Sequence, residues 1–153
     1  MMSKKHATIL CVGLVAGVVV IVHSGAMRRA VADAPSGRYQ IAAGEVLDTQ
    51  TGLLWQQVSS SSTMFWADAQ TYCGSGWRVP SMKEIQTLVD ETKTGPAIDT
   101  TAFPDVSATS GYDYWSSSPV AGLSSAAWWF VEFNSGSNSY GDPTSECRVR
   151  CVR

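Results

Sequence analysis

Histidine is almost absent from this sequence. The only two, His6 and His23, lie within the first 23 of its 153 residues. The rest of the chain therefore lacks the base of Ser-His-Asp and Cys-His catalytic sites, and it has no histidine ligand for zinc. These absences favour a protein that is not an enzyme of those classes.

Cysteine and lysine are also scarce. Beyond the N-terminal segment the chain keeps three cysteines, Cys73, Cys147 and Cys151, too few for a four-thiolate zinc site. An odd number leaves one thiol without a partner in the same chain. The only lysines there are Lys83 and Lys93. Lys83 lies at an expected helix start, so we interpret it as a solvated side chain and not as a catalytic base.

Basic charge is scarce outside the N-terminal segment. Four of the eleven basic residues fall within the first 29 positions, and the remaining seven stand against thirteen acidic residues, a net charge of about −6. Nucleic-acid binding needs a basic surface, and adhesion to anionic lipid needs one too. We therefore expect neither partner.

The N-terminal segment has the pattern of an export signal. An uncharged apolar run at 7–22 follows Lys4 and Lys5, and Ala30-Val31-Ala32 is typical of a cleavage site. The run is shorter than a usual membrane span, but Arg28 and Arg29 leave an uncleaved anchor open. We expect a signal peptide or N-terminal membrane anchor at 1–32, a linker at 33–44 and a single domain at 45–153.

Periodicity and turn residues predict an α+β domain. A hairpin is expected at 45–57, turning at Gly52. The predicted helices are 64–73, capped by Thr63 and stopped by Gly74, and 82–91, where Ser81 and Glu84 form a capping box. The expected strands follow the long 92–113 connection, at 114–118, 127–133 and 146–153.

The last predicted strand alternates cleanly. Its Cys147, Val149 and Cys151 point one way, and Arg148 and Arg150 point the other. Export places the cysteines in an oxidising compartment, where a disulfide persists. Spacing alone does not fix which two of the three pair.

A series of motifs in order resembles the Lcl C-terminal (collagen-like protein C-terminal) domain family of bacterial envelope proteins. The motifs are Asp48-x-x-Thr51-Gly52-Leu53-x-Trp55, Trp66-Ala67-x-Ala69, Gly76-Trp77-Arg78-Val79-Pro80-Ser81-x-x-Glu84-Ile85, Tyr114-Trp115-Ser116-Ser117-Ser118 and Val149-Arg150-Cys151-Val152-Arg153. The third motif also resembles formylglycine-generating-enzyme-like proteins. The resemblance implies a C-type-lectin-like fold: two helices on a small twisted antiparallel sheet, with long loops and a disulfide staple.

The resemblance also bears on disulfide pairing and ligand. It implies a link between the first helix and the last strand, so we expect Cys73–Cys151, with Cys147 as the alternative partner. One member of the family is associated with adhesion and with binding sulfated polysaccharide. A polyanion would suit this chain only if Arg148, Arg150 and Arg153 formed a basic stripe.

The tryptophans and the third motif are expected to be mostly structural. Trp55, Trp77 and Trp115 are predicted in the core, whereas the adjacent Trp128 and Trp129 must point to opposite faces of a strand. One of these two is left for a ligand, and we select Trp128. The structural motif comprises Trp77, Arg78, Pro80, Ser81 and Glu84, with a buried ion pair from Arg78 to Glu84 or an aspartate.

Ligand binding is expected on the loops at 99–113 and 134–145, because loops carry function more often than cores. The predicted ligand set is Asp105, Tyr112, Asp113, Trp128, Asn134, Asn138, Tyr140 and Asp142. Oxygen ligands of this kind also suit Ca²⁺, which we keep as a lesser possibility, and no other cofactor or metal is expected.

These observations predict an exported, non-catalytic binding module of the bacterial envelope or surface, with a carbohydrate or a protein as ligand. One alternative is a structural subunit of an envelope assembly. The other is a hydrolase that uses a carboxylate pair, for which the candidates are Asp90, Glu91, Asp99, Asp105 and Asp113.

Overall fold

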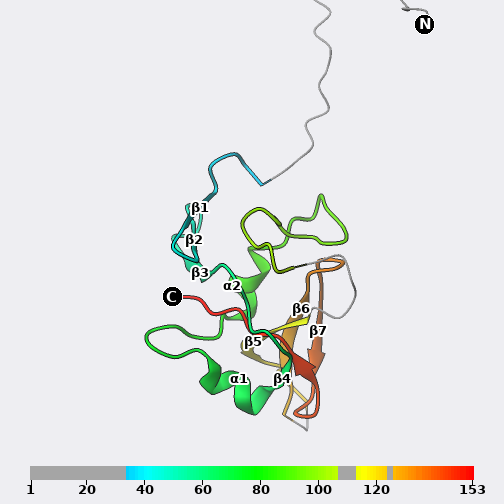
Figure 1. Cartoon of the computed structure of the whole chain (residues 1–153). Helices are drawn as coiled ribbons and strands as arrows, with labels where there is room; N and C mark the ends of the chain where they lie inside the picture. The colour runs from blue at the N-terminus through cyan, green and yellow to red at the C-terminus, as the bar shows by residue number, and fades with distance from the viewer. Residues whose placement is uncertain (1–33, 107–112, 124–125) are drawn as a thin grey trace, which may run out of the picture. The chain divides into compact units, whose positions relative to one another are not determined.

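The computed structural model describes residues 34–106, 113–123 and 126–153 (Figure 1). The predicted leader at 1–32 and the ligand candidate Tyr112 lie outside these ranges. The helices and strands are β1 (Tyr39–Ala42), β2 (Glu45–Asp48), β3 (Leu54–Gln56), β4 (Met64–Phe65), α1 (Trp66–Tyr72), α2 (Met82–Gln86), β5 (Asp113–Pro119), β6 (Trp128–Glu132), β7 (Ser137–Gly141) and β8 (Glu146–Cys147).

The described strands form three small antiparallel sheets, in the orders β1–β2–β3, β4–β8 and β5–β6–β7. The predicted hairpin at 45–57 is present as β2 and β3, and Gly52 adopts the expected positive φ of 73°. Residues 39–42, which we expected in the linker, form strand β1 and pair with β2. Residues 39–42 thus belong to the same sheet as the predicted hairpin.

The C-terminal segment connects the three sheets. Arg148 bridges Tyr114 of β5, and Val152 bridges both Trp55 of β3 and Arg78. Only its first two residues form a regular strand, β8, where a strand over 146–153 was predicted. The ladder is interrupted because the segment changes partners along its length, from β4 to β5 and then to β3.

Sheet β5–β6–β7 has a core cluster on each face. On one face, Tyr114 and Val131 pack with Ile85 and Leu88 from α2 and the residues that follow it. On the other, the cross-strand pair Trp115 and Phe130 packs near α1. A two-sided core explains why β6 has no simple polar face. The fold class is α+β, with two helices, antiparallel sheets and one disulfide among the described residues.

Helix α1 begins two residues later than predicted. Met64 and Phe65 form β4 and pair with β8, and Thr63 donates its hydroxyl to Glu146 instead of capping the helix. Phe65 and Tyr72 are exposed, whereas Trp66 and Ala69 are buried. The long-range pairing of β4 overrides the local helix pattern.

Helix α2 begins as predicted and ends early. The Ser81–Glu84 capping box is present with both of its hydrogen bonds. The helix ends at Gln86, and the next residues continue in tighter turns, with Leu88 N donating to the Ile85 carbonyl. Ile85 and Leu88 both enter the core, although the helix is shorter than predicted.

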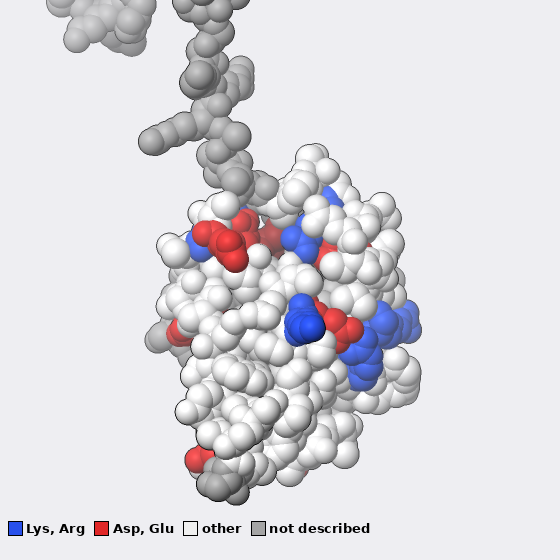
Figure 2. Space-filling view, turned by 180° about the vertical axis from the view of Figure 1, so that it is seen from behind, with Lys and Arg blue, Asp and Glu red and all other residues white. Residues whose placement is uncertain are grey.

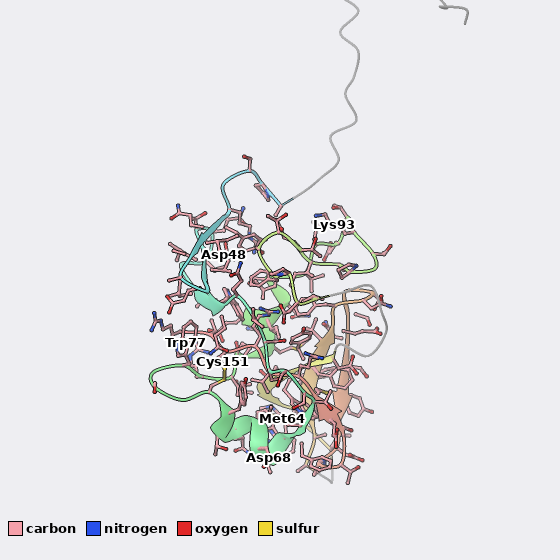
Figure 3. All side chains as sticks on the ribbon, in the orientation of Figure 1. Asp48, Met64, Asp68, Trp77, Lys93 and Cys151 are labelled. Carbon is pink, nitrogen blue, oxygen red and sulfur yellow. A yellow bond between two sulfur atoms is a disulfide. The ribbon has the colours of Figure 1, made fainter. Side chains whose placement is uncertain are left out.

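A disulfide joins Cys73, at the end of α1, to Cys151 in the C-terminal segment (Figure 3). The two Cα atoms are 5.8 Å apart, and 78 positions separate the residues in the sequence. The expected pairing is therefore confirmed. Cys147 is a buried free thiol, and burial together with the nearby charge of Asp113 raises its pKa.

Candidate functional site

A buried ion pair occupies the place where we expected a ligand carboxylate and an outward-facing arginine. The Arg150 side chain is fully buried, and its Nη2 lies 2.7 Å from Oδ1 of Asp105. Its Nη1 donates to the carbonyls of Gln56 and Gln57. The guanidinium also lies over the ring of Phe103, with Cζ 4.7 Å from the centroid. Arg150 thus ties the 92–106 connection to the C-terminal segment.

The second oxygen of Asp105 is engaged as well. Oδ2 accepts hydrogen bonds from the backbone N and the hydroxyl of Ser59, at 2.9 and 2.5 Å. Burial opposes ionisation of this carboxyl, but the charge of Arg150 and the Ser59 hydrogen bonds outweigh it, so the pKa lies below its usual value. Both carboxylate oxygens of Asp105 accept hydrogen bonds from within the domain, so neither is directed at a ligand.

The basic stripe that a polyanion would need does not form among Arg148, Arg150 and Arg153. Arg150 is buried, Arg148 donates to the Ser60 carbonyl, and Nη2 of Arg153 donates to both carboxylate oxygens of Glu45. Figure 2 shows positive groups beside negative ones in the upper part of one face, while the lower part of that face is almost uncharged. A polyanion finds no run of unpaired arginines among these three.

The structural motif is organised around Glu84. Its carboxylate receives two hydrogen bonds from Arg78, at 2.6 and 2.8 Å, and further ones from the N and hydroxyl of Ser81. Chiefly because of Arg78, the pKa of Glu84 falls to about 2. The predicted ion pair is present, but it is not buried, since the Arg78 side chain is 51% exposed.

Two of the predicted ligand residues shape turns. Asp142 is exposed, and its Oδ1 accepts hydrogen bonds from the backbone N and hydroxyl of Thr144. The backbone carbonyl of Asn134 accepts from the N of Gly95, which joins the β6–β7 turn to the 92–106 connection. The side chain of Asp142 is therefore used by its own turn, whereas the contact of Asn134 involves only its backbone.

Two carboxylates face each other across β5 and β6. Asp113 is directly opposite Glu132 in the register, and Glu132 accepts hydrogen bonds from the hydroxyls of Ser135 and Ser137. Burial, reinforced by the charge of Glu132, raises the pKa of Asp113. The same pair on an accessible surface would suit acid–base chemistry, but here Asp113 is half-buried and borders residues outside the described ranges.

The other candidate carboxylates mostly close local turns. Asp90 accepts from the N and hydroxyl of Thr92, and Asp99 accepts from the N atoms of Thr101 and Ala102. Glu91 is exposed. Within the described ranges, no group of three or more His, Cys, Asp or Glu side chains is placed to hold a metal ion.

A hollow of about 470 Å³ lies beside the N-terminal strand, between residues 34–41 and Asp99, Thr101 and Ala102. Its strongest polar group, Arg38, is directed away into a bidentate contact with the fully buried Asp48, at 3.1 and 2.8 Å. Arg38 also donates to the Thr87 carbonyl. A ligand site needs convergent polar groups. The guanidinium of Arg38 already binds Asp48 and the Thr87 carbonyl, so it is not directed into this hollow.

The adjacent tryptophans of β6 point to opposite faces, as predicted. Trp128 stacks on Trp66, with ring centroids 4.9 Å apart and planes inclined by 29°. It is half-buried against the cluster that contains Trp115. Trp128, which we selected for the ligand, is therefore committed to packing near α1.

Trp129 lies on the other face, where it meets Tyr140 of β7. The two residues are paired in the register, and their rings contact edge to face at 5.7 Å. Tyr140 is 52% exposed, and Asn138, two positions earlier on the same side of β7, is exposed too. No described residue makes a side-chain hydrogen bond to Asn138 or Tyr140. We name Trp129, Asn138 and Tyr140 the hairpin aromatic face.

The structure thus divides the predicted ligand set. Asn138 and Tyr140 lie together on an open surface, while Asp105, Trp128 and Asp142 are held by other contacts. Of the adjacent tryptophans we selected Trp128 for the ligand, but Trp129 is the one that lies beside Tyr140. Recognition of 137–141 as a strand would have found it, because pairing β7 with β6 places Trp129 beside Tyr140.

Comparison with known proteins gives one family. The model of the Lcl C-terminal domain matches residues 44–153. The comparison with curated proteins found no match. A search of the described helices for a membrane span found none of sufficient length and apolarity.

Proposed function

The chain belongs to the Lcl C-terminal domain family, and on that premise we propose that it is an exported, non-catalytic binding module whose ligand is a carbohydrate. The family and the disulfide are consistent with an exported, envelope-associated location. We also propose the C-type-lectin-like fold that the resemblance implies, supported by two helices, antiparallel sheets and a staple from α1 to the C-terminal segment.

The hairpin aromatic face carries the proposal for the ligand. A sugar ring presents C–H groups on one side and hydroxyls around its edge. Tyr140 and Trp129 supply aromatic surface for the C–H groups, and the Asn138 amide both donates to and accepts from hydroxyls. Neither Asn138 nor Tyr140 is used by the fold through a described side-chain hydrogen bond, so both are available to a ligand.

The lack of charge on the hairpin aromatic face favours an uncharged sugar. No member of the hairpin aromatic face carries a charge, and the three arginines that a polyanion would need, Arg148, Arg150 and Arg153, are buried or engaged. A sulfated polysaccharide loses its main source of affinity without unpaired cations. We therefore propose a neutral carbohydrate in place of the polyanion associated with one family member.

A glycan array and a heparin column test this proposal on residues 33–153. We expect retention of neutral glycans on the array and passage through heparin at low salt. The Tyr140→Ala variant should lose array binding. Tyr72→Ala is the matched control, because Tyr72 is also exposed but lies on α1. Binding that survives in Tyr140→Ala, or retention by heparin, contradicts the proposal.

A structural subunit of an envelope assembly is the second candidate. It is favoured by a different feature of the same hairpin, the open edge of β7. This role does not require a sugar ligand, so an array without a hit would leave it as the better account.

A further inference from the structure

We propose that the outer edge of β7 pairs with β7 of a second copy of the chain, antiparallel and centred on Ser139. Strand β7 stands at the end of the order β5–β6–β7, so β6 covers only one of its edges (Figure 1). Residues 137–140 are all exposed. The free N–H and C=O groups of an edge strand readily accept another strand.

The two edge strands of the β5–β6–β7 sheet differ in how well other backbone segments cover them. The β5 edge is covered by backbone hydrogen bonds: Trp115 N donates to Arg148, Arg148 N to Asp113, and Ser117 N to Pro80. The β5 strand also has a register shift before Pro119. Proteins commonly protect edges by cover, bulges, proline or charge. In contrast, no described backbone group covers the outer edge of β7.

The β7 sequence, Ser-Asn-Ser-Tyr-Gly, has none of the protective features in its side chains. It contains no charged residue and no proline, and it pairs with β6 over five consecutive positions without a bulge. The rest of the body carries a net charge of about −6, which disfavours contact between two copies elsewhere. The uncharged edge adds nothing to the repulsion between two acidic domains.

The residues of β7 complement one another when the strand is paired with itself. Centring on Ser139 is the register that pairs all five positions. Ser139 then faces Ser139 of the second copy, Asn138 faces Tyr140, and Ser137 faces Gly141. The first acidic residue beyond the strand, Asp142, faces Gly136 and not a second Asp142. This arrangement has two-fold symmetry, as in most homodimers.

A pair of five-residue strands is a small interface, well under the roughly 1,200 Å² of a stable complex. We therefore expect weak, concentration-dependent association that a covalent trap reveals best. Residues directly opposite in an antiparallel pair have Cβ atoms about 5 Å apart, which is close enough for a disulfide. Two copies of Ser137 would instead be four positions out of register, about 13 Å apart.

The test uses oxidative cross-linking of the full chain in a Cys147→Ala background. Ser139→Cys should form a covalent dimer at least tenfold faster than Ser137→Cys, which is equally exposed on the same strand. The parent without an introduced cysteine measures any background from Cys11. A mixture of Asn138→Cys and Tyr140→Cys should cross-link faster than either variant alone.

Equal rates for Ser139→Cys and Ser137→Cys would overturn the proposal, and so would a Ser139→Cys thiol that reacts only with other proteins. The comparison of Ser139→Cys with Ser137→Cys is separable from sugar binding, because neither residue belongs to the hairpin aromatic face. Cross-linking should therefore proceed whether or not a glycan is found.

Discussion

Arg150 and Asp105 neutralise each other inside the domain, with Nη2 and Oδ1 2.7 Å apart. The sequence pattern had placed the arginine on a solvent-facing side and the carboxylate in a ligand site. Their pairing fastens the 92–106 connection to the C-terminal segment. Binding must therefore be sought on surfaces that the interior leaves unused, which points to the β6–β7 hairpin.

Arg150→Met should destabilise the domain by about 3–5 kcal/mol, because it leaves Asp105 charged without its buried partner. The double variant Arg150→Met/Asp105→Asn removes that charge and should be more stable than the single variant. Denaturant unfolding of the oxidised protein measures both. Arg153→Met is the control, with a loss of at most about 1 kcal/mol, since its ion pair with Glu45 is partly exposed. A double variant that shows the full additive loss would contradict the account.

Removal of the disulfide should cost about 4 kcal/mol. Cys73→Ala/Cys151→Ala opens a link between residues 78 positions apart, and a closed loop of that length restricts the unfolded chain strongly. Thermal or denaturant unfolding measures the loss. In unreduced residues 33–153, a thiol reagent should find no reactive thiol in the native state and one, Cys147, after unfolding. Two or more thiols after unfolding would show that the staple is absent.

Arg38, directly before β1, should be needed for stability although the family match begins only at residue 44. Arg38 holds the fully buried Asp48 by two hydrogen bonds and also donates to Thr87 at the end of α2. Arg38→Met should cost about 3 kcal/mol or more. Arg38→Lys keeps the charge but not the bidentate geometry, and it should recover part of the loss. Equal unfolding midpoints for the unsubstituted protein, Arg38→Met and Arg38→Lys would show that the contacts of Arg38 do not stabilise the domain.

Acid should weaken the fold in steps. Asp48, Glu84 and Asp105 all have a pKa below the usual value in the folded protein, held there against burial by Arg38, Arg78 and Arg150 respectively. A depressed folded pKa gives stability above the unfolded pKa that is lost as the pH falls through the folded one. Stability should therefore decline from about pH 4 toward pH 2. Urea midpoints across this range measure it, and Glu84→Gln should flatten the lowest part. A urea midpoint that stays constant down to pH 2 would contradict the claim that Asp48, Glu84 and Asp105 stabilise the fold as carboxylates.

Local signals predicted several features correctly. Ser81 and Glu84 specify a capping box with adjacent residues alone, and Gly52 specifies its turn through a positive φ. The alternation of Trp128 and Trp129 follows from strand geometry once β6 is recognised. The Cys73–Cys151 pairing came from the family resemblance and was confirmed, since spacing alone left Cys147 open.

The remaining features depend on partners distant in sequence. Thr63 looks like a helix cap until β4 pairs with β8, which shifts α1 and turns Trp66 inward. Arg150 looks solvent-facing until the 92–106 connection covers it with Asp105 and Phe103. Strand β7 is short and polar, with few β-branched residues, so its sequence reads as a loop without β6 beside it. Without that strand, nothing in the sequence favoured Trp129 over Trp128 as the ligand residue.

The most direct test of the central claim is an NMR titration that follows the six tryptophan indole N–H signals as a neutral glycan retained on the array is added to residues 33–153. The account predicts that the Trp129 signal shifts in a saturable manner, whereas those of the fully buried Trp55 and Trp115 remain unchanged. It also predicts that Tyr140→Ala abolishes the shift. Saturable shifts confined to Trp77 or Trp128, with Trp129 unmoved, would contradict it.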